Sequence, residues 1–299
     1  MDRIGFASFL SAHGFQIIKA GDELWVEKRR FVLENIPPHR RIHLSRWDAA
    51  KVFLRGYAVL QYSCEETEAT SSFEFVCEDK EYGMKSLTKN VRWSVRKGLK
   101  NCTVRRIDFD LLGEQGCAIN CSVFARQGRV GLPVYTEPRL WKAFTAACKA
   151  FPEIEPYGAL AGGRLCAYLL TVPVDEYVYF YHPFAETESL KLCPMNALVF
   201  IVVQTLIQRP EVNRVSYGLE PLDPLPELER FKHSMGFRKR SIGRRLVVNP
   251  LALPFLTRPA QRLAQVLFGR GKFRGYLMEF LRFARAFQAE RAGSAESKA

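Results

Sequence analysis

The stretch Glu176–Gln208, "EYVYFYHPFAETESLKLCPMNALVFIVVQTLIQ", decides the fold. Its first ten residues are rich in aromatic and β-branched side chains, which predicts a strand over 176–185. A polar loop follows, and Pro194 then stands where proline is favoured, in the first turn of a helix. That helix is apolar on nearly every face, so we expect it to be buried. The stretch therefore predicts an aromatic strand, a loop and a central helix in direct succession.

The periodicity of apolar residues and the turn residues also predict the elements before and after this stretch. Gly162-Gly163 forms a turn pair that permits positive φ, which predicts a hairpin around it. The other predicted elements are strands over 102–109, 214–221 and 238–249 and helices over 110–128, 136–151 and 225–237. From residue 101 onward the order is β-α-α-β-β-β-α-β-α-β. The predicted fold class is α/β, with a mixed sheet flanked by helices.

Residues 1–80 read as short strands around one helix over 45–56. We predict three successive parts: an N-terminal region over 1–100, a main domain over 101–250, and a basic helical tail over 251–299.

The N-terminal region ends in the segment Met84–Lys100, "MKSLTKNVRWSVRKGLK", which carries six basic residues and no acid. On a helix of about 100° per residue, five of these charges fall on one stripe. The stripe consists of Lys85, Lys89, Arg92, Arg96 and Lys100. Like charges four residues apart repel, so an external anion would offset the repulsion.

The whole chain of 299 residues has a net charge of +13, which indicates nucleic acid, anionic membrane or phosphorylated substrates as partners. General solubility is the alternative. The beginning of the chain shows no secretory signal, and the longest apolar run is too short to cross a bilayer. The eight cysteines include no C-x-x-C pair, so we expect free thiols, no metal site and a cytoplasmic location.

The tail segment 258–288 holds seven Arg or Lys residues and one acid, Glu279, with apolar residues at helical spacing. A basic amphipathic helix is typical of a membrane-surface or partner-binding segment. It would place the protein at the inner face of the cytoplasmic membrane. A helix packed on the domain, with its arginines facing water, is the alternative.

Three stretches together resemble the FemAB-like branch of the GNAT acyltransferase superfamily. "SLTKNVRWSVRKGLK" resembles the basic helix of that branch, with Arg92, Arg96 and Lys97 at its spacing. "HPFAETESLKLCPMNALVF" resembles its strand, loop and helix that opens at a proline. "VSYGLEPLDPLPELERFKHSMGF" resembles the strand, loop and "FK" helix near the end of such domains. The likeness covers about residues 86–248, and residues 1–80 would then be a degenerate second GNAT-like half.

This resemblance implies an enzyme that transfers an acyl or aminoacyl group to an amine of a cell-envelope glycan, a peptidoglycan precursor or a lipid-linked substrate. GNAT enzymes that use acyl-CoA usually place a glycine-rich loop before the central helix, where backbone N–H groups surround the pyrophosphate. No glycine occurs here between Gly163 and Gly218. The donor therefore stays open between acyl-CoA and an aminoacyl-tRNA, and Lys191 and Asn196 are the candidates for contact with its phosphates.

The resemblance also proposes residues for the chemistry. Lys232 matches the lysine of the "FK" motif and is the first candidate, as a cation facing donor phosphate or the developing oxyanion. His182 is a candidate base, Tyr217 a candidate proton donor, and the loop carboxylates Glu220 and Asp223 are further candidates. The structural alternatives are a capping histidine, a core tyrosine with a satisfied hydroxyl, solvated carboxylates and an exposed lysine.

Two other functions stay open. The missing glycine loop favours a non-catalytic module that binds RNA or anionic membrane. An acyl-CoA-dependent GNAT enzyme with an atypical pyrophosphate loop is the other alternative.

Overall fold

The computed structural model describes residues 1–128, 130–220 and 225–252, which form two compact units. The first unit contains residues 1–13, 74–218 and 226–239. The second contains residues 14–73 together with the described residues of 219–225 and 240–252. Both units are thus discontinuous in sequence, whereas the sequence predicted contiguous parts over 1–100 and 101–250. The boundaries fall inside β5 (Thr70–Cys77), inside β10 (Arg214–Leu219) and just after the start of β11 (Arg238–Val248).

The sheet of the first unit has the order β6-β7-β8-β9-β10, and β5 follows β10. Its other strands are β6 (Thr103–Arg106), β7 (Glu155–Ala161), β8 (Arg164–Val174) and β9 (Tyr177–Ala185). Neighbouring strands from β6 to β9 are antiparallel, and β10 runs parallel to β9. The predicted mixed sheet is confirmed.

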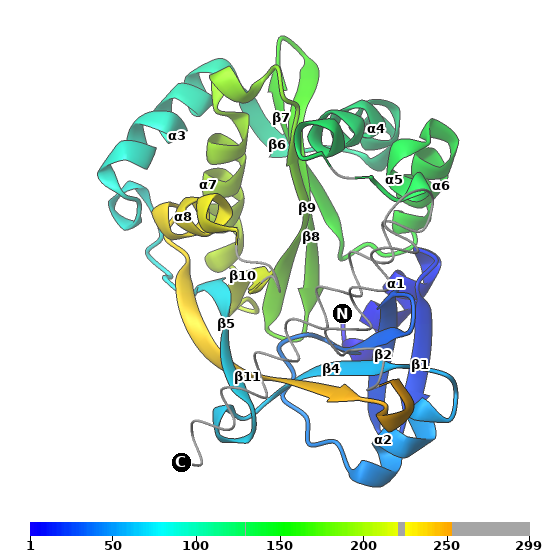
Figure 1. Ribbon diagram of the computed structural model, residues 1–299. Coiled ribbons are helices and arrows are strands. Elements are labelled where there is room, and N and C mark those ends of the chain that lie inside the picture. The colour runs from blue at the N-terminus through cyan, green and yellow to red at the C-terminus, as the bar shows by residue number, and fades with distance from the viewer. Residues whose placement is uncertain (129, 221–224, 253–299) are drawn as a thin grey trace. The chain divides into compact units, whose positions relative to one another are not determined.

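Helices cover both faces of this sheet. Figure 1 shows α3, α7 and α8 on one face of β8 and β9, and α4, α5 and α6 on the other. Their bounds are α3 (Lys89–Asn101), α4 (Phe109–Arg126), α5 (Pro133–Thr136), α6 (Pro138–Cys148), α7 (Pro194–Ile207) and α8 (Pro226–Ser234). α7 is the predicted central helix, begins at the predicted proline, and has nine buried residues.

The helix α1 (Arg3–Ala12) was not predicted. Its N-cap is Asp2, whose side chain accepts a hydrogen bond from the amide of Gly5, so the sequence does carry a start signal. Phe6 and Phe9 are buried against the tyrosines Tyr179 and Tyr181 of β9. This packing explains why the first residues of the chain belong to the first unit.

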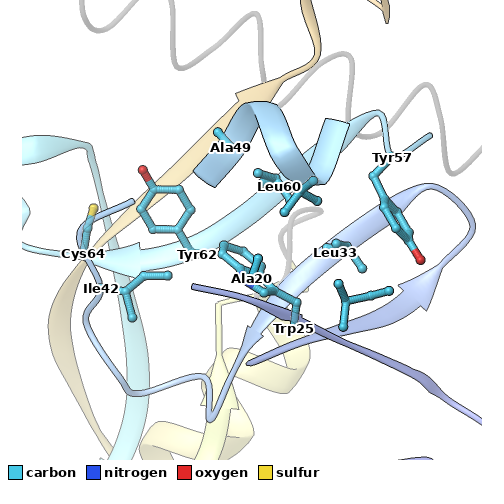
Figure 2. Packing of buried hydrophobic residues seen from close by; sticks show 11 residues of the cluster. Ala20, Trp25, Leu33, Ile42, Ala49, Tyr57, Leu60, Tyr62 and Cys64 are labelled. Atoms are coloured by element: carbon cyan, nitrogen blue, oxygen red, sulfur yellow. The ribbon is translucent and has the colours of Figure 1, made fainter. Parts of the chain in front are cut away.

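The strands of the second unit follow the order β1-β2-β3-β4-β11, and β5 follows β11. Its other elements are β1 (Gln16–Ala20), β2 (Glu23–Arg29), β3 (Val32–Ile36), β4 (Val59–Cys64) and the helix α2 (Arg46–Phe53). Figure 2 shows side chains from α2 and the strands converging on one cluster. Trp25 is fully buried there and lies edge-on against Tyr62, with ring centroids 6.0 Å apart.

The basic helix is shorter than the sequence predicted. Residues Met84–Ser86 form a separate 3₁₀ turn, Leu87 and Thr88 are extended, and α3 begins at Lys89. Lys85 therefore does not lie on the helical stripe, which keeps Lys89, Arg92, Arg96 and Lys100. The helix starts late because Leu87 is buried and the amide of Thr88 donates to the carbonyl of Ser234, which holds this segment extended.

No helix in the described part of the chain is long and apolar enough to cross a membrane. The predicted tail helix over 258–288 lies outside the described residues.

The close approach of α3 and α7 depends on Gly98. A Cβ at this position would lie 2.4 Å from the carbonyl oxygen of Cys193 and 2.8 Å from the Cβ of Ala197. Gly98→Ala should therefore lower the free energy of unfolding by about 1–3 kcal/mol, although alanine favours helices. Denaturant unfolding measures this change. Lys100→Ala, on the exposed face of the same helix, is the matched control, and a Gly98→Ala variant as stable as the wild type would contradict the packing.

Candidate functional site

The two central strands of the first unit part from one another. β9 and β10 pair over three positions, Arg214 with Tyr177, Val215 with Val178, and Ser216 with Tyr179. Beyond Ser216 and Tyr179, β9 continues to Ala185 and β10 continues to Leu219, but their residues no longer pair with each other. The facing edges of the two strands are therefore not paired with each other over these last residues.

A local turn in β10 accompanies the parting. The buried hydroxyl of Ser216 accepts a hydrogen bond from the amide of Gly218 at 3.1 Å, and Gly218 has a φ of +88°. A side chain that bonds to its own backbone competes with the sheet ladder. Glycine is the residue that adopts this φ without strain.

Lys232 lies beside the point of parting, within a group of aromatic rings. Its Nζ lies 4.7 Å from the ring centroid of Phe75 on β5 and 5.0 Å from that of Tyr217 on β10. Lys232 is only 3% exposed, although it is a lysine near the end of the short helix α8. Such distances are typical of cation–π contacts, which stabilise an ammonium group without neutralising its charge.

No hydrogen bond or ion pair to Lys232 Nζ occurs within the described ranges. The nearest acid on its helix, Glu229, forms an ion pair with Lys239 instead. Burial lowers the pKa of Lys232 to about 8, and Glu229 partly opposes this change. The ammonium group is thus still largely protonated at neutral pH, and it lies against the ring faces of Phe75 and Tyr217.

Tyr217 belongs to the same group. Its ring lies edge-on to Phe180 of β9, to Phe231 of α8 and to Phe237. Burial raises the pKa of its hydroxyl, so the group stays protonated at physiological pH. The structure therefore brings together Lys232 and Tyr217, two of the residues that the sequence proposed.

His182 lies in a different cluster. The β8–β9 register places Tyr168 opposite Phe184 and Leu170 opposite Tyr181, so β9 has one extra residue at this point. His182 takes a φ of +51° in the bulge. Alternation would place it on the side of Phe180, but the bulge turns its ring toward Tyr181 and Tyr135, whose centroids lie 4.3 and 4.5 Å away.

The surroundings of His182 make it a weak base. Burial lowers its pKa to about 3, with a smaller contribution from His13. Its Nε2 is buried and has no hydrogen-bond partner in the part of the chain that the structure describes. The structure thus does not place His182 with Lys232 and Tyr217.

Of the two loop carboxylates that the sequence proposed, Glu220 lies within the described residues. Glu220 lies in the second unit, where its side chain accepts a hydrogen bond from the hydroxyl of Ser72 at 2.9 Å. Its backbone carbonyl accepts from Arg244 and its amide donates to the carbonyl of Phe73, so this residue is firmly held. Asp223 lies outside the described residues.

The basic residues on α3 split into two kinds. Arg92 turns back and donates to the carbonyls of Leu87 and Lys85, at 3.1 and 3.3 Å, so it holds the segment before the helix. Lys89 and Arg96 are exposed, with no ion pair to any acid that the structure describes. The stripe is therefore a surface feature, opposite the face on which Gly98 contacts α7.

Lys191 and Asn196 flank the start of α7. Lys191 is exposed in the 3₁₀ turn Leu190–Leu192, and Asn196 directs its amide nitrogen to Met235 Sδ at 3.8 Å. Cys193 caps the helix in the left-handed region, with φ +58°, a conformation that glycine adopts more readily. Among the residues described, no group of three or more His, Cys, Asp or Glu side chains is arranged to hold a metal ion.

The sequence did not predict the rings around Lys232. Phe75 contacts the ammonium group directly, whereas Phe180 and Phe237 contact Tyr217. Phe75 and Phe180 come from stretches that read as strands, and Phe237 was predicted as the end of a helix. No local signal in these three segments shows that they meet beside a lysine. The lysine itself was found through the "FK" motif.

The comparisons with known proteins support the fold. The sequence matches no protein-family model and no curated protein sequence. FemX is similar in structure, with a TM-score of 0.57 and 10% identity over 88% of this chain and 93% of FemX. L-PGS from Bacillus licheniformis has a TM-score of 0.52 and 11% identity over 87% of this chain and 93% of its own.

A third similar structure is the C-terminal domain of a protein named as a lysylphosphatidylglycerol synthetase from Agrobacterium fabrum. Its TM-score is 0.54, with 9% identity over 85% of this chain and 91% of that domain. At such identities the likeness concerns the fold. The resemblance to the FemAB-like branch of the GNAT superfamily is thereby confirmed at the level of fold.

The buried ammonium group predicts an unusual stability profile for Lys232→Met. Its pKa is about 8 when folded and about 10.5 when unfolded, so below pH 8 the folded chain bears the whole cost of burying the charge. Between these values the folded chain loses the proton first, and wild-type stability rises with pH. Lys232→Met should therefore be more stable than the wild type at pH 7, on the order of 2 kcal/mol, with a smaller difference at pH 10.

Denaturant unfolding at the two pH values measures this difference. Arg230→Met, which removes an exposed cation from the same helix, is the matched control and should show no such pH dependence. A Lys232→Met variant that is less stable than the wild type at pH 7 would show that the charge stabilises the fold.

The buried histidines should not titrate in the physiological range. Burial lowers the pKa of His13 to about 4 and that of His182 to about 3, so both rings should stay neutral from pH 8 to pH 5. NMR titration of the imidazole protons measures this, with His13→Asn and His182→Asn for assignment. A His182 midpoint near 6.5 would restore this residue as a candidate base.

Proposed function

We propose that the protein is an N-acyltransferase of the FemAB-like type, which transfers an acyl or aminoacyl group to an amine of a cell-envelope precursor. The observation that carries this proposal is the buried, unneutralised ammonium group of Lys232 beside the parted strands β9 and β10. A protein bears the cost of such a charge most readily where an anion or a developing negative charge arrives. The similarity to FemX and to proteins named for lysylphosphatidylglycerol synthesis supports envelope substrates.

The negative charge that develops in this reaction lies on the carbonyl oxygen of the donor, where the ammonium group of Lys232 could stabilise it. The amine nitrogen attacks the donor carbonyl, a C–N bond forms, and the carbonyl oxygen becomes an oxyanion. The C–O bond of an ester or the C–S bond of a thioester then breaks, and the proton from the amine passes to the leaving oxygen or sulfur. A cation in a water-poor site stabilises the oxyanion more strongly than water does. We assign this role to Lys232.

Tyr217 has a supporting role in this proposal. Its hydroxyl stays protonated, so it would serve as a hydrogen-bond donor to the leaving group rather than as a base. Its ring also contacts both Lys232 and Phe180, which fixes the ammonium group between β10 and α8. His182 and Glu220 are not needed for this account, because each is held in another setting.

The two candidate donors, acyl-CoA and an aminoacyl-tRNA, both carry phosphate. The exposed cations Lys89 and Arg96 of α3 and Lys191 near α7 are suited to phosphate contacts. The start of α7 has no glycine, and Cys193 occupies the left-handed position. This departure favours an aminoacyl-tRNA over acyl-CoA as donor, and reconstitution with each donor separates the two.

The test compares envelope precursors from cells that lack the protein with those from cells that express it. Mass spectrometry should find an amide-linked acyl or aminoacyl group that disappears with the protein and returns with the wild type. Lys232→Met should restore less than about one hundredth of the product, as expected when one electrostatic group is lost. Lys232→Arg should retain part of the activity, and the exposed control Arg230→Met should retain all of it.

Reconstitution with the purified protein then identifies the donor, with aminoacyl-tRNA and acyl-CoA supplied in separate reactions. Full turnover by a folded Lys232→Met variant would contradict the assignment of Lys232. Precursors that are identical with and without the protein would contradict the transferase proposal itself and favour a binding module.

A further inference from the structure

The second unit exposes large apolar side chains on the outer face of α2. Trp47 is 80% exposed and Leu54, at the C-cap of this helix, is 88% exposed. They are seven residues apart, so they project from nearly the same side of the helix. Ala49 and Val52 occupy the opposite side and are buried in the core, as Figure 2 shows for Ala49. The two exposed side chains are therefore not displaced core residues.

Two more exposed apolar residues lie next to the segment that follows α2. The carbonyl of Phe31, in the β2–β3 turn, accepts hydrogen bonds from the amides of Ala58 and Val59. Leu251 is 82% exposed, and it follows Asn249, whose amide donates to the carbonyl of Ala58. Figure 1 shows this last turn of the described chain beside α2. We call the surface formed by Phe31, Trp47, Leu54 and Leu251 the α2 surface.

Exposed cations border the α2 surface and outnumber the described carboxylates there, which are Asp48 on α2 and Glu27, the acceptor of the Phe31 amide. Arg46 and Arg55 lie on the two sides of the line through Trp47 and Leu54, at the beginning and just past the end of the helix, and both are exposed. The guanidinium of Arg30 lies over the ring of Phe31, 4.9 Å from its centroid. Lys51 lies between Trp47 and Leu54 on the helix and is also exposed, although it bonds to Asp48.

We propose that the α2 surface docks onto an anionic lipid bilayer. Trp at the headgroup level, bulky aliphatic side chains below it and Arg or Lys around them are the composition of an interfacial membrane contact. The positive rim complements an anionic headgroup layer, which is why we favour a membrane over a neutral apolar partner. The surface belongs to one unit and is separate from Lys232, so this proposal does not depend on the transferase assignment.

The proposal also differs from the prediction for the basic tail. Residues 258–288 could bind membrane without any contribution from α2. The α2 variants leave the tail intact, so they measure the α2 surface in the full chain.

Trp47 offers a direct probe. The chain has four tryptophans, of which Trp25 and Trp141 are fully buried and Trp93 is exposed on α3. In a Trp93→Phe background, quenching by acrylamide therefore reports mainly on Trp47. Phosphatidylcholine vesicles with about one third phosphatidylglycerol should shift the emission to the blue and protect Trp47 from acrylamide, and lipids brominated near the headgroup should quench it.

Vesicle co-sedimentation then tests the energetics. Trp47→Ser with Leu54→Ser should lower the partition coefficient at least about tenfold, because both side chains lose their apolar contact. Arg46→Gln or Arg55→Gln should each lower it about fivefold at low salt. All four positions are exposed, so the variants should unfold close to the wild-type denaturant concentration. Arg55→Gln also removes a hydrogen bond from Arg55 to the carbonyl of Lys19, so Arg46→Gln is the cleaner test of charge.

The matched control removes the same side chains elsewhere. Trp93→Ser with Leu99→Ser takes an exposed Trp and Leu from the basic helix α3 and should leave vesicle binding within about twofold of the wild type. Binding that is lost in this control and kept in the α2 variant would overturn the proposal. Equal binding to pure phosphatidylcholine vesicles would also overturn it. Protection of Trp47 from acrylamide in the absence of lipid would overturn it as well, because another segment or a second copy would then cover the surface.

Discussion

The ammonium group of Lys232 lies against two aromatic rings and forms no ion pair with any carboxylate that the structure describes, and these contacts constrain the first unit. They require β5 to bring Phe75, β10 to bring Tyr217, and α8 to end where Lys232 meets both. They also require β10 to leave β9 after Ser216, since Tyr217 then meets the side chain of Phe180 instead of continuing the ladder. The grouping of Lys232 with Phe75 and Tyr217 thus depends on the separation of β10 from β9.

The sequence predicted most of the elements, because hydrophobic period and turn residues are local properties. The hairpin at Gly162-Gly163 and the helix that begins at Pro194 are where the pattern placed them. Features that depend on distant contacts were missed. α1 is stabilised by rings of β9, and the late start of α3 depends on Ser234, which lies far along the chain. Of the residues grouped around the buried ammonium group, the sequence proposed the "FK" lysine, Lys232, and Tyr217.

His182 shows why the rest of the site could not be predicted. A histidine on a regular strand shares the face of every second neighbour, which for His182 would be the side of Phe180. One extra residue in β9 reverses the direction of its side chain, and burial among aromatic rings then lowers its pKa to about 3. A bulge is a property of the pairing between two strands, so neither strand shows it alone.

The basic residues of the chain lie in three different settings. Lys232 is isolated and buried, Lys89 and Arg96 are exposed along α3, and Arg46 and Arg55 border apolar side chains on α2. The buried ammonium group carries the functional account, and NMR of lysine side chains labelled at Cε measures its pKa directly. The account predicts that Lys232 titrates near pH 8 in the free protein. A Lys232 midpoint near 10.5, the ordinary value for a solvated lysine, would contradict it.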